Sequence, residues 1–328
     1  MTCSSKMHAL PSDVDLALRC LLKILQSPPA KIKALGQPKD GIDDGAMEVS
    51  ALEQISDWLY TDWYTALNLL EEPQALIPGR DNLASALRAS IAASTRWETG
   101  WVAMKTALNG MCLAGRGNQT RKLRPSEYVN MVRQGMPVAP GDHIAVTELM
   151  EWIDESTGFW CARSWIAEPQ KPLVRLYFST RSDQVGFVLM EATETLDNLK
   201  LAYSLKCSVF PSNYSRVDSL IVYLEARSWS RNAVEITAMA RCVRNLLRNV
   251  TPPLTKKIAQ GVAFAEDPGT EESFGENRCR ALAPGVLTLL QDKRSSPDDG
   301  LDILTESLRT AGIDPMQPWI DAVRHERR

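Results

Sequence analysis

Apolar residues recur every three or four positions along the first part of the chain, which is the spacing of amphipathic helices. One such pattern covers residues 12–27, where we expect Ser12 to cap the helix and two prolines to end it. A linker rich in Pro, Gly and Asp follows, and two further helices are predicted over residues 50–72 and 81–97. The sequence therefore predicts a helical N-terminal region over residues 1–96.

The pattern then changes to short apolar runs that are separated by Gly, Pro and Asp turns. These runs, over residues 97–165, predict a small antiparallel β-region. Residues 172–227 read as strand, helix, strand and strand, which suits a βαβ-like unit with a hairpin-like strand joining it. The fold class predicted for residues 97–328 is thus α+β, with a mixed β-sheet and flanking helices.

The C-terminal part of the chain reads as helical. A long helix is predicted over residues 230–250, and another begins where Ser273 and Glu276 have the spacing of a capping box. We expect Pro284 and Gly285 to interrupt that helix, and two short helices to finish the chain.

Strand alternation predicts which side chains share a face, because successive residues of a strand point to opposite sides of the sheet. In "PLVRLYFST", Arg175 and Tyr177 lie opposite an apolar row. In "LAYSLKCSV", Lys206 lies on a face where its neighbours Ser204 and Ser208 are small. If the two strands pair, Arg175, Tyr177 and Lys206 share one floor with space for a ligand.

Three more arginines are candidates for an anion site next to this floor. Arg216 would enter from the loop after the second strand. Arg278 and Arg280 lie just inside the helix that Ser273 begins, whose free N–H groups favour phosphate. Each residue also has an ordinary interpretation: a solvated lysine, a packed tyrosine, snorkelling or ion-paired arginines, and a loop ion pair between Arg216 and Asp218.

Composition narrows the possible functions. The chain has 328 residues, 44% of them hydrophobic, and a net charge of −3, which does not suggest a nucleic-acid-binding surface. Seven cysteines without CxxC spacing favour reduced thiols in a cytoplasm, and no run of 18 apolar residues could span a membrane. The three histidines lie far apart, the P-loop Lys-Ser/Thr is missing, and no serine-hydrolase signature occurs. A metal site and a nucleotide-dependent transferase are therefore not favoured.

Several segments together resemble a known family. The runs "PLVRLYF", "LKC", "NYSRVDSLIVYL", "GVAFAEDPG" and "SFGENRCRALA" occur in this order. They resemble the HopA effector-like family, whose bacterial members include a plant-pathogen type III effector and the lyase subunits of thioamitide and class V lanthipeptide pathways. The resemblance runs from about Trp97 to Leu290 and is clearest after Pro172.

The resemblance implies β-elimination of phosphate from phosphoserine or phosphothreonine, which leaves dehydroalanine or dehydrobutyrine. The implied partners are a phosphorylated ribosomal precursor peptide and a kinase subunit similar to aminoglycoside phosphotransferases, with no cofactor. By similarity to the more distant phosphothreonine lyases, Lys206 corresponds to the general base and Arg216 to a phosphate-binding arginine. The run from Arg175 to Tyr177 corresponds to a Lys-x-His pair, which makes Tyr177 the candidate acid.

The chemistry fits these residue types. A general base must be unprotonated, and nearby arginines together with partial desolvation favour the neutral amine of a lysine. Arg175 and Arg216 could also hold the phosphate with pairs of hydrogen bonds. The alternative is a non-catalytic effector or scaffold subunit that binds a kinase or a host protein.

Overall fold

The structure is a computed structural model, and it describes residues 9–37, 44–65, 80–91, 97–133, 135–148, 150–292 and 296–321. Its α-helices are α1 (Ser12–Leu25), α2 (Ala30–Leu35), α3 (Asp44–Trp58), α4 (Arg80–Ala89), α5 (Val185–Asn198), α6 (Ala226–Cys242), α7 (Phe274–Gln291) and α8 (Pro297–Thr310). A π-helical turn, η1 (Leu59–Tyr64), extends α3.

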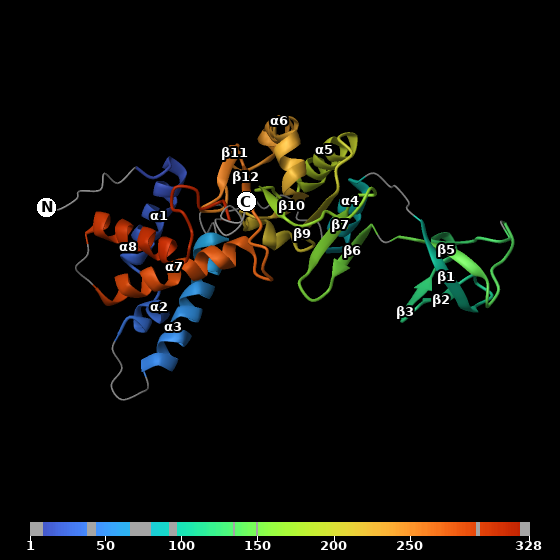
Figure 1. Cartoon of the computed structure of the whole chain (residues 1–328), viewed down its shortest axis with the longest axis horizontal. Helices are drawn as coiled ribbons and strands as arrows, with labels where there is room; N and C mark the ends of the chain where they lie inside the picture. The colour runs from blue at the N-terminus through green and yellow to red at the C-terminus, as the bar shows by residue number, and fades with distance from the viewer. Residues whose placement is uncertain are drawn as a thin grey trace.

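The strands form two separate sheets (Figure 1). The smaller has the order β3-β2-β1-β5-β4 and the larger the order β11-β12-β8-β10-β9-β7-β6. Their bounds are β1 (Trp97–Thr106), β2 (Cys112–Arg116), β3 (Gln119–Leu123), β4 (Tyr128–Asn130), β5 (His143–Thr147), β6 (Glu151–Asp154), β7 (Phe159–Arg163), β8 (Leu173–Phe178), β9 (Tyr203–Ser208), β10 (Leu220–Glu225), β11 (Lys256–Ala259) and β12 (Val262–Glu266).

The α+β class is confirmed, but the predicted mixed sheet is wrong. In the larger sheet, β10 lies between β8 and β9 and pairs antiparallel with both. β8 and β9 therefore run in the same direction, as the βαβ-like pattern predicts, without touching each other. Every strand ladder of the described residues is antiparallel, because the hairpin strand fills the gap that the crossover leaves.

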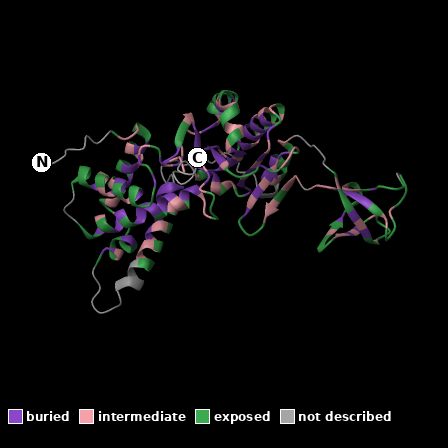
Figure 2. Cartoon of the chain, viewed as in Figure 1, coloured by how far each residue is buried: buried purple, intermediate pink, exposed green. Residues whose placement is uncertain are grey.

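The two faces of the larger sheet are covered by different helices, and Figure 2 shows the buried residues concentrated along it. One face carries the alternate apolar residues of β8, β9 and β10 and packs against α4, α5 and α6. The other face packs against the helical part of the molecule, where α1, α3, η1, α7 and α8 share a second core. The five-stranded sheet has a third core of its own around Trp101.

The N-terminal helices differ in detail from the prediction. Pro11 occupies the N-cap position of α1, so Ser12 is the first residue of the helix and does not cap it. The helix predicted over residues 50–72 begins earlier, at Asp44, and passes into the π-helical turn η1. Its predicted end lies outside the described residues. The helix predicted over residues 81–97 ends earlier than expected, because α4 ends at Ala89 and Trp97 is the first residue of β1.

Helix α7 continues through Pro284, so the predicted interruption is wrong. Proline lacks an N–H and strains the turn before it, which normally ends or kinks a helix. Here the hydroxyl of Ser307 on α8 enters the broken turn. It accepts from the N–H of Gly285 at 3.0 Å and donates to the carbonyl of Ala281 at 2.7 Å. Of the two short C-terminal helices that were predicted, the described residues contain α8 alone.

Candidate functional site

The strand register places Arg175, Tyr177 and Lys206 on one face of the larger sheet. Ile221 of β10 lies opposite Tyr177 on one side and Lys206 on the other. Tyr223, two residues later, lies opposite Arg175 and Ser204 in the same way. Because β10 separates the two strands, the side chains of β8 and β9 are about 10 Å apart. This is the face that also carries the second core.

Lys206 lies where this face is half-open. Burial alternates along β9, with Ser204 and Lys206 partly exposed and their neighbours buried. The Lys206 ammonium lies 4.8 Å from the ring centre of Phe159 and 6.0 Å from that of Tyr223. Among the residues that the structure describes, no carboxylate lies within ion-pair distance of it. Lys206 is thus held by aromatic rings and is not neutralised by a described acid.

Cys161 of β7 is the neighbour of Lys206 across the strands. Burial raises the pKa of the Cys161 thiol, and the positive charge of Lys206 partly opposes that rise. The pKa of the Cys161 thiol therefore depends on the charge of Lys206.

Tyr223 is the residue of this face that sequence reasoning missed. Its ring lies between two cations, with the guanidinium carbon of Arg175 5.2 Å from the ring centre on one side and Lys206 on the other. The side chain is partly exposed, and its hydroxyl makes no hydrogen bond to the described residues. The alternation in "LIVYLE" would have revealed it if the central position of this strand had been known.

Arg175 is buried and engaged by an acid. It is 6% exposed, and its Nε and Nη2 bind Oδ2 of Asp267 at 2.7 and 2.6 Å. Burial alone would lower its pKa, but the nearby Tyr177, Tyr223 and Asp267 outweigh that effect and raise it. In this conformation the charge of Arg175 is used within the fold.

Tyr177 lies beneath the start of α7. It is 2% exposed, and its ring centre is 6.4 Å from that of Phe274. Burial raises the pKa of the Tyr177 phenol, against the opposing effect of Arg175. Its position on the face of Lys206 agrees with the strand pattern, but the helix covers it, and its role as an acid stays a prediction.

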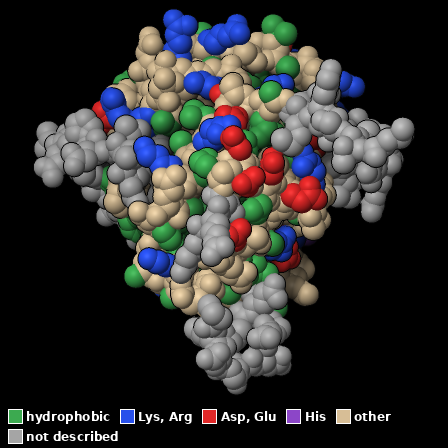
Figure 3. Space-filling model, turned by 90° about the vertical axis from the view of Figure 1, so that its left-hand side faces the viewer, with side chains coloured by type: hydrophobic (Ala, Val, Ile, Leu, Met, Phe, Trp, Pro, Cys, Tyr) green, Lys and Arg blue, Asp and Glu red, His purple; other side chains and the backbone are tan. Residues whose placement is uncertain are grey.

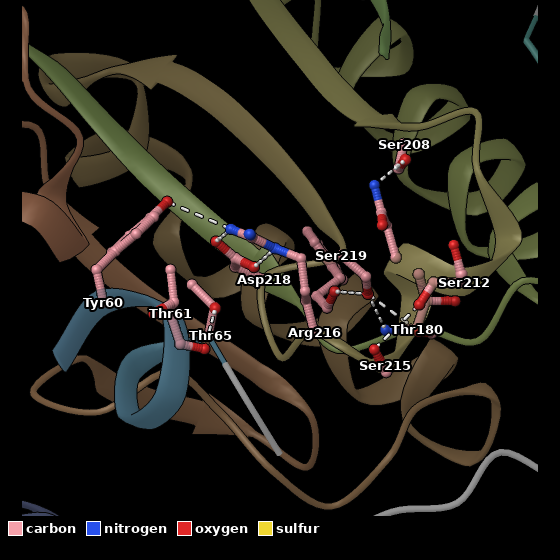
Figure 4. Close-up of polar contacts among 12 residues, drawn as sticks. Tyr60, Thr61, Thr65, Thr180, Ser208, Ser212, Ser215, Arg216, Asp218 and Ser219 are labelled. Carbon is pink, nitrogen blue, oxygen red and sulfur yellow. Dashed lines mark hydrogen bonds and ion pairs between the residues drawn. The ribbon is translucent and has the colours of Figure 1, made fainter. Parts of the chain in front are cut away.

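Arg216 lies at the edge of the same face, where the helical part meets the sheet (Figure 4). Its Nε and Nη2 bind the two oxygens of Asp218, each at 2.9 Å, and Nη2 is 3.3 Å from the hydroxyl of Tyr60. Tyr60 belongs to η1 and packs against the second core. The Arg216 side chain is 31% exposed, so one part of the guanidinium faces solvent. The loop ion pair that was one interpretation of the sequence is therefore present.

The two arginines of α7 have different surroundings, because Arg278 lies near Tyr64 and Tyr177 whereas Arg280 is exposed. The capping box of Ser273 and Glu276 is confirmed at the helix start. Arg278 is buried, stacks on Phe274 at 4.5 Å and donates to the carbonyls of Pro318 and Ile320 at 2.7 and 3.1 Å. Burial lowers the pKa of Arg278 to about 10. Its contacts fasten the C-terminal segment against the helix.

Arg280 is exposed and pairs with Glu272. It lines a groove of about 470 Å³ between α7 and α8, whose lining mixes polar and apolar residues. Figure 3 shows the helical end of the molecule, where acidic and basic side chains are intermixed and no large patch of one sign forms. In this conformation Arg280 is engaged by Glu272, and its role in phosphate binding stays a prediction.

The described residues contain neither a candidate metal site nor a membrane-spanning helix. No group of three or more His, Cys, Asp or Glu among them could hold a metal ion, and His8 and His325 lie outside the described part. Within the same part of the chain, no helix is long and apolar enough to cross a membrane.

Solved structures of effector proteins from Pseudomonas syringae pv. syringae strain 61 and pv. tomato strain DC3000 are similar, with 13% and 12% identity and TM-scores of 0.48 and 0.44. The similarity covers 95% and 93% of this chain and 98% of each effector. A search of curated proteins finds no match. Residues 155–320, just over half of the chain, match the model of the HopA1 effector protein family, and the chain therefore belongs to that family.

Proposed function

We propose that the protein is a phosphoserine/phosphothreonine lyase that acts on a ribosomal precursor peptide after a kinase has phosphorylated it. The observation that supports this proposal is Lys206. It is a half-exposed amine on a sheet face that also carries Arg175 and Tyr223, and no described carboxylate neutralises it. Lysine is one of the side chains that act as general bases, once its amine is unprotonated.

In the proposed reaction, the unprotonated amine of Lys206 takes the Cα proton of the phosphorylated residue. The electrons of that C–H bond form the Cα=Cβ double bond, and the Cβ–O bond breaks with both its electrons going to phosphate. The products are a dehydrated residue, inorganic phosphate and a protonated lysine, which loses its proton to water. The step needs no oxidant, metal or organic cofactor.

Arg216 is the arginine that we propose to bind the phosphate. Its guanidinium already forms the two-pronged contact that suits a phosphate, with the Asp218 carboxylate in that position. A phosphate dianion would have to displace Asp218, and the exposed part of Arg216 gives it a way in. Arg175, Arg278 and Arg280 can assist only if their present partners also let go.

The test is phosphate release from a phosphoserine peptide that the partner kinase has produced. Lys206→Ala should stop release and let phosphopeptide accumulate, while the melting temperature stays near the wild-type value. Lys256→Ala is the matched control, because Lys256 also lies over an aromatic ring, Trp319, but at the far edge of the sheet. Complete dehydration of the peptide by the Lys206→Ala protein in a mass spectrum would refute the proposal.

Phosphopeptide binding tests the clamp separately. The Arg216→Ala variant loses a charge-assisted contact worth about 1.5–3 kcal/mol. Its affinity for the phosphopeptide should therefore be roughly tenfold weaker, or more. Equal affinities of the wild type and this variant in a titration would rule out Arg216 as the phosphate ligand.

A second candidate function is a non-catalytic effector or scaffold subunit. The observation that favours it is that the carboxylates of Asp267 and Asp218 already bind Arg175 and Arg216, two of the arginines proposed to bind phosphate. A wild-type protein that binds the kinase tightly but releases no phosphate would support this function over the lyase.

A further inference from the structure

We infer that Tyr223 is a catalytic residue of the proposed lyase site and that its hydroxyl gives a proton to the departing phosphate. This inference rests on the proposed function and adds to it the residue that protonates the leaving group. Tyr223 belongs to β10, the strand between the two strands that carry Arg175 and Lys206.

The geometry singles out Tyr223 from the other tyrosines on this side of the sheet. Its ring centre is 5.2 Å from the guanidinium carbon of Arg175 and 6.0 Å from the ammonium nitrogen of Lys206. The ring of Tyr223 is thus flanked by one cation from β8 and one from β9. In contrast, Tyr177 and Tyr64 are 2% and 1% exposed and lie under α7.

The hydroxyl of Tyr223 is also uncommitted, since it makes no hydrogen bond to any residue that the structure describes. Tyr60, the remaining tyrosine here, already binds Arg216. A partly exposed phenol without a protein partner can donate to a ligand, and this is what the departing oxygen requires.

The proton balance gives Tyr223 a defined task. Elimination from a phosphate dianion would release the highly charged trianion unless a proton reaches the bridging oxygen as the Cβ–O bond breaks. The Tyr223 hydroxyl supplies that proton, so hydrogen phosphate leaves and a phenolate remains. Lys206 meanwhile holds the proton taken from Cα, and exchange with water returns both side chains to their starting states.

The experiment compares phosphate release by the wild type, Tyr223→Phe, Tyr223→His and Tyr128→Phe with one phosphoserine peptide. Tyr223→Phe keeps the ring and loses only the hydroxyl, so release should fall about 100-fold or more, as for loss of a general acid. Its affinity for the phosphopeptide should stay at the wild-type value. Tyr223→His restores a proton donor and should recover part of the rate.

Tyr128→Phe is the matched control, because Tyr128 donates to the carbonyl of Gly110 in the five-stranded sheet, and its rate should equal that of the wild type. Wild-type release that is unchanged in Tyr223→Phe would overturn this inference and leave the lyase intact. A larger loss in Tyr177→Phe than in Tyr223→Phe would also overturn it, by giving the task to Tyr177. A wild type that releases no phosphate would overturn the proposed function and the inference with it.

Discussion

The three cations on or beside the face shared by β8, β9 and β10 have different binding partners. Arg175 is bound by Asp267 in a buried pair, Arg216 by Asp218 at a half-open edge, and Lys206 by aromatic rings. A buried ion pair mainly fixes geometry, since the cost of desolvation offsets much of its attraction. The pair with Asp267 therefore holds Arg175 against the ring of Tyr223, whereas Lys206 pairs with no described carboxylate.

Removing Asp267, the acid partner of Arg175, should lower the stability of the fold. In Asp267→Ala a buried guanidinium loses its counter-ion, and the free energy of unfolding should fall by about 3–5 kcal/mol. Denaturant unfolding measures this. Glu306→Ala, which removes an exposed partner of Arg309, should change stability by less than about 0.5 kcal/mol. A loss in Asp267→Ala no larger than in this control would show that the pair is not needed.

The thiol of Cys161 should report the charge of Lys206. Thiolate is the form that reacts with alkylating agents, so a raised pKa moves labelling of Cys161 to higher pH than for an ordinary thiol. Because the ammonium opposes that rise, Lys206→Met should move labelling to still higher pH. Peptide mass spectrometry across a pH series measures both, with exposed Cys242 as the internal control. The same labelling profile in the two proteins would show that the charges do not interact.

At the scale of elements, the pairing of α7 with α8 depends on one hydroxyl. Pro284 removes a donor inside α7, and Ser307 of α8 satisfies the N–H of Gly285 and the carbonyl of Ala281 next to it. Gly285 also permits the close approach, because a Cβ there would lie 2.9 Å from that of Ser307. The start of α7 in turn covers Tyr177, so this helix pair shapes one side of the candidate site.

Ser307→Ala should therefore destabilise more than the loss of an ordinary helical serine. Two partly buried backbone groups lose their partner, and we expect unfolding to require about 1–3 kcal/mol less free energy. Denaturant melts give the value. Ser230→Ala is the control, since Ser230 is exposed and its hydroxyl only donates to the carbonyl of Ala226 within α6. Equal stabilities of the two variants would mean that α7 tolerates Pro284 without α8.

At the scale of the whole molecule, three separate cores divide the chain differently from the predicted boundary at residue 97. The helical N-terminal region shares a core with α7 and α8 from the other end of the chain. α4 instead packs in the core on the opposite face of the larger sheet. The five-stranded sheet is a third unit, and the family match begins after it, at residue 155.

Because the third core is separate, damage to it should stay local. Trp101 is 2% exposed, and Arg116 and Arg121 lie over its ring. Trp101→Ala should destabilise this unit by about 3–5 kcal/mol. Hydrogen exchange should then lose protection over residues 97–148 and keep it in β8, β9 and β10. Loss of protection throughout the larger sheet would show instead that the two sheets unfold together.

The alternation of polar and apolar residues along the sequence predicted much of the candidate face. Alternation in β8 and β9 correctly separated Arg175, Tyr177 and Lys206 from the apolar rows, because strand geometry is a property of neighbouring residues. The capping box at Ser273 was found for the same reason. The insertion of β10 and the passage of α7 through Pro284 were missed, since they depend on strand order and on Ser307, which is far away in the sequence.

By itself, the sequence determined the α+β class, the succession of strands and helices, and the side of each strand on which its polar residues stand, since these follow from periodicity and local backbone chemistry. Only the tertiary structure decided that Tyr223 lies between Arg175 and Lys206 and that α7 covers Tyr177. It also decided that Asp267 and Asp218 form ion pairs with Arg175 and Arg216. These facts arise from contacts between residues far apart along the chain, and no local pattern encodes such contacts.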